Sequence, residues 1–335
     1  MGARRIEGAL RKDNSSGYAA LRGGAALVET PVGRLRLHGA DRRSYLQGLL
    51  TNDIAALVPG TGCYAAMLTA QGRMITDMRV LELGDAVLLD LPRDLTGAVG
   101  DHLERFVFAE DVRVEDVTAS IAAVGLYGPR SRDVLSGLPV EGALPSALHT
   151  STRIRVAGVD ATAVAGDAPG VAGFDLLVDA VARDAIVTVL ERAGAVRASA
   201  EDVDTVRVES GRPLFGVDMD TETIPLEAGL EQRAISRSKG CYVGQEVIVR
   251  VQDRGHGRVA RHLVGLTLDA ASPVPSRGSA IHAGGREIGR VTSAVWSPAL
   301  GRPIALGYVH RDFVEPGTRV QVTATDAIVA ALPFV

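Results

Sequence analysis

The chain has 335 residues, of which 46% are hydrophobic and 23% charged, and its formal net charge is −4 at pH 7. The length favours two or three domains, and the composition excludes a wholly disordered chain. The slight acidity excludes a broadly basic nucleic-acid coat, and no apolar run of about 18 residues is present to span a membrane. With only Cys63 and Cys241, a disulfide framework is implausible, so we expect a cytoplasmic protein.

The first stretch, residues 1–22, is polar, basic and rich in turn-forming residues, and we expect a flexible leader. It lacks the apolar segment that a secretory signal requires. From residue 23 the pattern becomes periodic. Strands are expected at 35–37, 63–69, 74–83, 86–91, 112–116, 121–126, 153–156, 161–165 and 174–178, and helices at 41–50, 94–106, 181–193 and 199–210, with a further helix beginning near 128.

The pattern changes near residues 255–270, where the helix signal nearly vanishes. Short strand-like runs separated by Gly, Pro and Ser follow, as in a small barrel or sandwich. We therefore predict an α+β body over residues 23–255 and an all-strand domain over 256–335. Within the body, 138–151 loses periodicity and is expected to be a surface connection, and 247–251 is expected to be a strand.

The segment Lys239–Glu246, which reads Lys-Gly-Cys-Tyr-Val-Gly-Gln-Glu, is the most distinctive in the chain. Lys239 lies two residues from Cys241, and Arg237 adds a second cation. A neighbouring cation stabilises a thiolate, which is the nucleophilic and metal-binding form of cysteine. This pattern indicates a reactive thiol, with Cys241 and Lys239 as catalytic candidates. The alternative is a small buried cysteine that leads into a strand.

Glu209 is expected near the C-terminus of a helix, where the helix dipole disfavours a carboxylate. A carboxylate in that place could clamp an amidine-like edge, such as the N–C–N face of a pterin, through two hydrogen bonds. The alternative is a solvated or arginine-paired glutamate.

Asp77 shares one face of the expected strand 74–83 with Ile75 and Arg79. A carboxylate among apolar residues could be desolvated and placed near a reacting nitrogen. The alternative is a surface ion pair between Asp77 and Arg79.

Other classes of site find little support in the sequence. The spacing of His and Cys predicts no metal site, and there is no P-loop or dinucleotide fingerprint. A basic stretch could contact a polyanion such as a polyglutamate tail or RNA, or could be a solvated rim; it comprises Arg250, Arg254, His256, Arg258, Arg261 and His262.

The string Lys239–Glu246 resembles the signature of the folate-binding YgfZ family, K-G-C-[Y/F]-x-G-Q-E. Other segments are similar to this family and to its relative, the T-protein of the glycine cleavage system, an aminomethyltransferase; they are 45–53, 71–73, 207–213 and 287–308. The resemblance covers about residues 25–330.

This resemblance implies a T-protein-like α+β fold, with two α+β lobes and a C-terminal β-barrel around a central tetrahydrofolate channel. Glu209 matches the pterin-binding glutamate of the T-protein, and Arg237 and Tyr242 are further candidates for folate contact. Asp77 lies in the region of the T-protein's paired aspartates, where Thr76 takes the place of one carboxylate.

The YgfZ branch is associated with assembly or repair of iron–sulfur clusters and with tRNA thiolation. The resemblance therefore implies a tetrahydrofolate-binding accessory protein, whose partners are iron–sulfur client enzymes or assembly proteins, with possible tRNA contact and no membrane. The alternatives are a folate-dependent aminomethyltransferase and a non-catalytic folate- or tRNA-binding module. Any enzymatic activity is expected to be one-carbon transfer.

Overall fold

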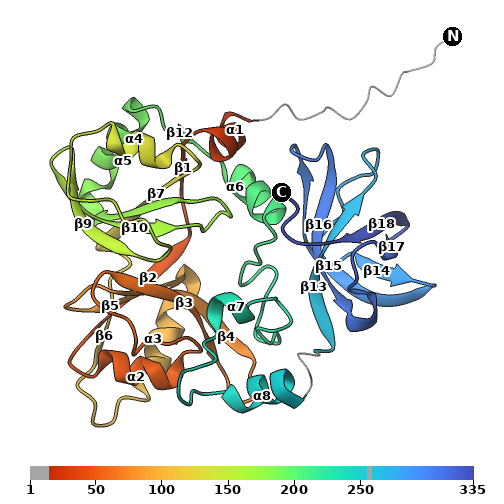
Figure 1. Cartoon of the computed structure of the whole chain (residues 1–335), viewed down its shortest axis with the longest axis horizontal. Helices are drawn as coiled ribbons and strands as arrows, with labels where there is room; N and C mark the ends of the chain where they lie inside the picture. The colour runs from red at the N-terminus through yellow and green to blue at the C-terminus, as the bar shows by residue number, and fades with distance from the viewer. Residues whose placement is uncertain (1–14, 255–258) are drawn as a thin grey trace.

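A computed structural model describes residues 15–254 and 259–335 as three lobes (Figure 1). Two of the lobes are sheets with helices, and the third is a β-barrel. In Figure 1 the segment 211–245 runs through the centre, between the two sheet lobes and the barrel. No helix in the described part of the chain is long and apolar enough to cross a lipid bilayer.

The first lobe contains a sheet in the order β12-β1-β7-β11-β10-β9-β8. Its core packs α4 (Ser131–Ser136) and α5 (Arg183–Arg192) against the strands. β1 pairs with both β7 and β12, so a segment near the start of the chain joins a sheet formed mostly by residues 121–197. The strands are β1 (Ala26–Val28), β7 (Ile121–Tyr127), β8 (Val140–Glu141), β9 (Ser151–Val156), β10 (Val159–Gly166), β11 (Gly173–Asp179) and β12 (Val196–Arg197).

The second lobe contains a sheet in the order β3-β4-β5-β2-β6, with α2 (Arg42–Leu49) and α3 (Thr96–Glu104) packed on one face. Along β4 the side chains alternate between faces. Met78 and Val80 enter the core beside the helices, while Leu81 packs toward the first lobe. The strands are β2 (Val32–His38), β3 (Thr61–Leu68), β4 (Met74–Glu82), β5 (Val87–Pro92) and β6 (Arg113–Asp116).

The two sheets meet through a small apolar cluster. Leu81 and Leu88 come from the second lobe, and Val164 and Leu177 come from β10 and β11 of the first lobe. Since Asp77 and Arg79 share the strand face of Leu81, the pleat directs these charged residues toward the boundary between the lobes.

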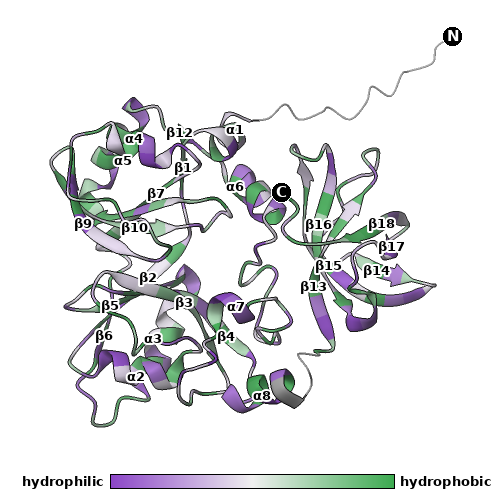
Figure 2. Ribbon diagram, in the orientation of Figure 1, coloured by the Kyte–Doolittle hydropathy of each residue, from purple (hydrophilic) through white to green (hydrophobic). Residues whose placement is uncertain are grey.

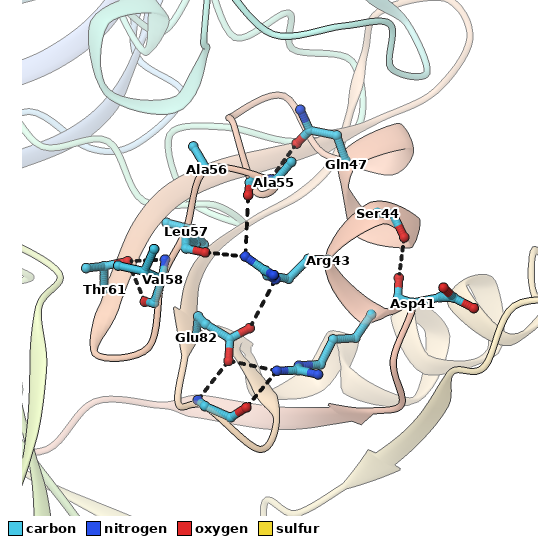
Figure 3. A network of polar contacts seen from close by, with 12 residues as sticks. Asp41, Arg43, Ser44, Gln47, Ala55, Ala56, Leu57, Val58, Thr61 and Glu82 are labelled. Carbon is cyan, nitrogen blue, oxygen red and sulfur yellow. Dashed lines mark hydrogen bonds and ion pairs between the residues drawn. The ribbon is translucent and has the colours of Figure 1, made fainter.

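A polar network fixes the loop between α2 and β3 (Figure 3). Glu82 is buried at the end of β4 and forms ion pairs with Arg42 and Arg43 at 3.0 and 3.8 Å. Arg43 also donates to the carbonyl of Leu57 at 2.6 Å, and Gln47 Oε1 accepts from the amides of Ile54 and Ala55. These contacts hold the chain that follows α2, on which the segment around Lys239 docks.

The third lobe is a closed barrel in the order β13-β16-β15-β14-β17-β18 over the described C-terminal residues. The helix α6 (Ala200–Glu209) packs against β15 and β16 and so joins the barrel to the first lobe. In Figure 2, α6 carries both hydrophobic and hydrophilic residues. The strands are β13 (Arg261–Leu268), β14 (Ala280–Ala283), β15 (Arg286–Ser297), β16 (Arg302–His310), β17 (Arg319–Val322) and β18 (Thr325–Ala330).

The predicted α+β class with a C-terminal barrel is confirmed. The predicted helix at 199–210 is α6, which begins with a capping box formed by Ser199 and Asp202. Gly211 follows the helix with φ 64°, a left-handed conformation that favours glycine. The predicted boundary at 255/256 falls in a stretch outside the described residues.

Two predicted elements are wrong. Part of the expected leader is a helix, α1 (Ser16–Gly23), because Ser15 caps it and Tyr18 and Leu21 are buried against the first lobe. The expected strand at 247–251 is instead α8 (Gln245–Val249), continued by a π-helical turn over Arg250–Arg254. The short apolar run fits a strand or a helix, and Ile248 and Val251, three residues apart, pack against the same core cluster, as one face of a helix does.

Candidate functional site

A cluster of ionisable side chains lies where the two sheet lobes meet, and we call it the interlobe cluster. Its first part is Arg79 on β4, which contacts Asp90 Oδ2 through Nε at 3.0 Å and Asp175 Oδ2 through Nη1 at 2.7 Å. Burial alone would lower the pKa of Arg79, but the two carboxylates raise it above its ordinary value. One guanidinium thus joins β5 of one lobe to β11 of the other.

Asp77 lies on the same face of β4, two residues before Arg79. Its carboxylate accepts a hydrogen bond from the hydroxyl of Tyr64 on β3. The guanidinium of Arg233, from α7 (Glu231–Ala234), stacks over the Tyr64 ring with its Cζ 5.0 Å from the centroid. Burial raises the pKa of Asp77 although the Tyr64 hydrogen bond opposes the shift. The carboxyl is thus desolvated, and Arg79 is paired with other residues.

The cluster continues through Asp167, which follows β10. Asp167 forms an ion pair with Arg212, and its Oδ1 lies 3.9 Å from Arg233 Nη2. The side chains of Arg212, Asp167 and Arg233 are 23%, 20% and 34% exposed, so this end of the cluster is open to solvent.

His149 faces the same group from the segment between β8 and β9. Burial lowers its pKa to about 4, and the guanidinium groups of Arg79, Arg233 and Arg212 act in the same direction. Its carbonyl oxygen lies only 2.9 Å from the position that a Cβ on Gly62 would take. Gly62 is two residues from Tyr64 on β3, so His149 lies over the strand face that carries Tyr64.

Tyr64, Arg212, Arg233 and His149 were not predicted as site residues. Only Tyr64 had a usable signal: β3 and β4 form a hairpin in which residue 66 pairs with residue 77, which brings Tyr64 diagonally beside Asp77. The other three come from distant segments, and His149 lies in the stretch expected to be a plain surface connection.

The segment around Cys241 docks on the C-terminus of α2. Lys239 is 9% exposed, and its Nζ donates to the carbonyls of Gln47, Leu50 and Asn52 at 2.6, 2.5 and 3.0 Å. An ammonium suits a helix C-terminus, where carbonyl groups lack partners. All three N–H donors are used there, so the expected pairing of Lys239 with the Cys241 thiol is not present.

Cys241 itself is exposed, and this excludes the alternative of a buried cysteine. Arg237 is also exposed. Tyr242 is 8% exposed and packs its ring 5.0 Å from Lys239 Nζ, and burial raises its pKa to about 12. Tyr242 thus anchors the segment, and its contact with folate stays a prediction.

Glu209 has a different environment from the one expected. Its side chain is fully buried, and it accepts hydrogen bonds from Tyr18 Oη at 2.9 and 3.0 Å and from Ser297 Oγ at 2.5 Å. Arg22 of α1 forms an ion pair with the same carboxylate. The pterin clamp is therefore corrected: these partners occupy both carboxylate oxygens and leave no free edge for a ligand.

Arg207, two residues before Glu209 on α6, also joins lobes. Its Nη1 lies 2.7 Å from Asp218 Oδ2, and its Nη2 donates to Ser293 Oγ of β15 at 2.8 Å. Asp218 accepts in turn from Thr292 and Ser293. Arg207 and Glu209 thus fix α6 to the barrel, and we call their contacts the α6–barrel network.

The predicted basic stretch is only partly described. Arg250 is exposed, whereas Arg261 is paired with Glu227 at 3.1 Å and stacked over Tyr308. His256 and Arg258 lie outside the described residues, as does the side chain of Arg254. In the part that the structure describes, no group of three or more His, Cys, Asp or Glu side chains is arranged to hold a metal ion.

Comparison with known families decides the wider relationship. Residues 12–239 match the GCVT N-terminal domain, and residues 261–335 match the glycine cleavage T-protein C-terminal barrel domain. The chain belongs to the glycine cleavage T-protein family. The family match begins before α1, which covers the last part of the expected leader; residues 1–14 of that stretch lie outside the described residues.

The matches to named relatives cover most of this chain and most of each relative. An aminomethyltransferase of Saccharopolyspora erythraea is 30% identical over 327 residues, which span 95% of this chain and 88% of the relative. A probable aminomethyltransferase of Natronomonas pharaonis is 32% identical over 316 residues, covering 90% and 85%.

A crystal structure of the glycine cleavage system aminomethyltransferase T from Bartonella henselae superposes with a TM-score of 0.83. It covers 95% of this chain and 88% of that protein, at 22% identity. The superposition supports the predicted T-protein-like fold. The named relatives are aminomethyltransferases, and assignment to the YgfZ branch stays a prediction from the string Lys239–Glu246.

Proposed function

We propose that this protein binds a reduced folate, tetrahydrofolate or a one-carbon derivative, at the interlobe cluster and acts on its one-carbon unit as an aminomethyltransferase-like enzyme. The observation that carries the proposal is Asp77, a desolvated carboxyl with a raised pKa beside Tyr64 and Arg233. A carboxyl of this kind can exchange a proton with a folate nitrogen at which a carbon bond forms or breaks. The aminomethyltransferase names of relatives with similar length support the reaction class.

Calorimetric titration with tetrahydrofolate tests the binding step. We expect saturable binding to the parent protein, and binding at least tenfold weaker in Asp77→Asn, because an amide cannot make the charge-assisted hydrogen bond that a carboxylate makes to a folate N–H. Asn keeps the shape of the side chain and an oxygen for the Tyr64 hydroxyl. Asp160→Asn, an exposed carboxylate on β10, is the matched control. Equal affinity of parent and Asp77→Asn would contradict the assignment of Asp77.

Supply of aminomethylated lipoyl carrier protein tests the reaction itself. An aminomethyltransferase forms methylene-tetrahydrofolate under these conditions, and Asp77→Asn is expected to lower the rate by at least a hundredfold. Folate binding without any turnover would remove the transferase and leave a folate-binding accessory protein.

A second candidate is the iron–sulfur accessory role of the YgfZ branch, and one specific observation favours it. The Lys-Gly-Cys segment is held firmly by Lys239 and Tyr242, yet it leaves Cys241 exposed. A fixed, accessible thiol suits transient contact with a sulfur or iron species of a client protein.

Complementation of a deletion strain separates this role from transferase activity. If the thiol is the working group, Cys241→Ala abolishes complementation, as judged by iron–sulfur enzyme activity, while tetrahydrofolate binding persists. Cys63→Ala, which changes the partly buried second cysteine, is the matched control. Full complementation by Cys241→Ala would exclude a chemical role for the thiol. Contact with tRNA stays a prediction, to be tested by the salt dependence of tRNA affinity.

A further inference from the structure

His149 is the residue of the interlobe cluster whose backbone conformation is unusual. Its φ is 62°, in the left-handed region that non-glycine residues rarely adopt. Hydrogen bonds hold the backbone in place on both sides, since His149 N donates to Ala165 O at 2.9 Å and Ala165 N donates to Thr150 O at 2.9 Å. Strain of this kind persists where the surrounding structure enforces it and is concentrated at functional sites.

The imidazole of His149 also carries an unpaired polar atom. Its Nδ1 is buried and has no hydrogen-bond partner among the residues that the structure describes. The charged groups that face the ring are Arg79 on β4, Asp167 after β10, Arg212 after α6 and Arg233 on α7. Three of these four are cations, so the ring is neutral and offers one nitrogen acceptor and one N–H donor.

Arg212, which faces the same ring, has a matching feature. Its Nη2 is engaged by Asp167, but its Nη1 is buried without a hydrogen-bond partner in the described part of the chain. Buried polar groups without partners are rare in folded proteins and need an explanation. The interlobe cluster therefore holds one unpaired ring nitrogen and one unpaired guanidinium nitrogen, and both atoms are enclosed although the Arg212 side chain as a whole is 23% exposed.

We propose that His149 and Arg212 hold the lactam edge of the bound pterin, with Arg212 Nη1 donating to the ring oxo group and His149 Nδ1 accepting from the adjacent ring N–H. This inference rests on the proposed binding of folate at the interlobe cluster, and it adds the residues that recognise the oxo group and the neighbouring N–H of the pterin ring. It makes both residues specificity determinants, because an edge with the donor and acceptor exchanged does not fit.

Two ligands that differ at this edge alone provide the test. Tetrahydrofolate has the oxo group, and tetrahydroaminopterin has an amino group in its place, which reverses the donor and acceptor pattern. Calorimetry of the parent is expected to show tetrahydrofolate binding at least tenfold tighter. In His149→Gly, affinity for tetrahydrofolate is expected to fall about tenfold, the equivalent of about 1.4 kcal/mol, while affinity for the amino analogue changes less than twofold.

His149→Gly is a well-behaved variant because glycine adopts the left-handed backbone without strain. Thr323→Gly, which relieves a similar φ of 58° in the turn between β17 and β18, is the matched control and should change neither affinity. Arg212→Met is expected to abolish the preference between the two ligands. A second readout, the ¹⁵N NMR shift of His149 Nδ1, should move on binding of tetrahydrofolate.

Equal affinity of the parent for the two ligands, or unchanged tetrahydrofolate binding by His149→Gly with no movement of its NMR signal in the parent, would overturn this inference and leave the proposed function intact. Failure of the parent to bind tetrahydrofolate at all would overturn both.

Discussion

The α6–barrel network and the interlobe cluster are both groups of arginines and carboxylates between lobes, but they differ in how completely their polar atoms are paired. In the network, Glu209 and Asp218 accept hydrogen bonds on both oxygens from α1, α6 and β15. In the cluster, His149 Nδ1 and Arg212 Nη1 have no partner among the described residues. The first arrangement joins lobes, and the second has capacity left for a ligand.

This difference shows why residue type alone misleads about function. Glu209 and Asp77 are both carboxylates in segments that resemble the T-protein, and the sequence offered both as folate ligands. Only the pairing distinguishes them, because a buried charge with a full set of partners stabilises the fold, whereas a desolvated carboxyl with few partners can change its protonation state.

The largest expected effect comes from breaking the network. Glu209→Ala removes one partner of a buried ion pair and leaves Arg22, Tyr18 and Ser297 unsatisfied, so we expect the free energy of unfolding to fall by about 3–5 kcal/mol. Urea unfolding measures the change, with Glu104→Ala on the exposed side of α3 as a control that should stay within about 0.5 kcal/mol. A loss of tetrahydrofolate affinity in Glu209→Ala without a matching loss of stability would instead identify Glu209 as a folate ligand.

The next largest effect is expected at Lys239. Its ammonium group is fully paired, as the carboxylates of the α6–barrel network are. Lys239→Met leaves the carbonyls of Gln47, Leu50 and Asn52 without their donor, and we expect a loss of about 2–3 kcal/mol in thermal or urea unfolding. The rate at which Cys241 reacts with a neutral alkylating agent should change little, since Lys239 is engaged elsewhere. A large fall in that rate would instead support activation of the thiol by Lys239.

A smaller effect is expected in the pH dependence of stability, through His149 of the interlobe cluster. The pKa of His149 is lowered to about 4 from the ordinary 6.5, so between these values the unfolded chain binds a proton that the folded protein does not. Stability contributed by the neutral ring is therefore complete above about pH 6.5 and is lost as pH falls toward 4, with a slope of at most about 1.4 kcal/mol per pH unit. Urea midpoints at several pH values should show a shallower slope for His149→Gly than for the parent; identical slopes would contradict the buried neutral ring.

The smallest expected effect is a difference in reactivity between the two cysteines, measured by counting reactive thiols. Burial raises the pKa of Cys63 to about 12, although Lys239 opposes the shift, so at pH 8 it remains a protonated thiol. Cys241 is exposed. A disulfide reagent at pH 8 should therefore titrate one thiol in the native protein and two after denaturation, and none quickly in native Cys241→Ser. Two rapidly reacting thiols in the native parent would contradict the burial of Cys63.

Much of the local structure was predictable because it depends on neighbours in the chain. The capping box of α6, the hairpin of β3 and β4 and the alternation along β4 follow from propensity, turn chemistry and the period of the strand. The same reasoning failed at 16–23 and 247–251, where tertiary burial of a few apolar side chains selected a helix.

The sequence by itself determined the α+β class, the all-strand C-terminal part, the resemblance to the T-protein family and the side of β4 on which Asp77 lies, since each of these depends on composition, period or a continuous motif. Only the tertiary structure decided that β1, which directly precedes β2 of the second lobe, joins the sheet of the first lobe, that Glu209 and Lys239 are structural, and that His149, Arg212 and Arg233 gather around Asp77. Those contacts join residues far apart in the chain, and their burial and pairing depend on how three separately formed lobes pack together.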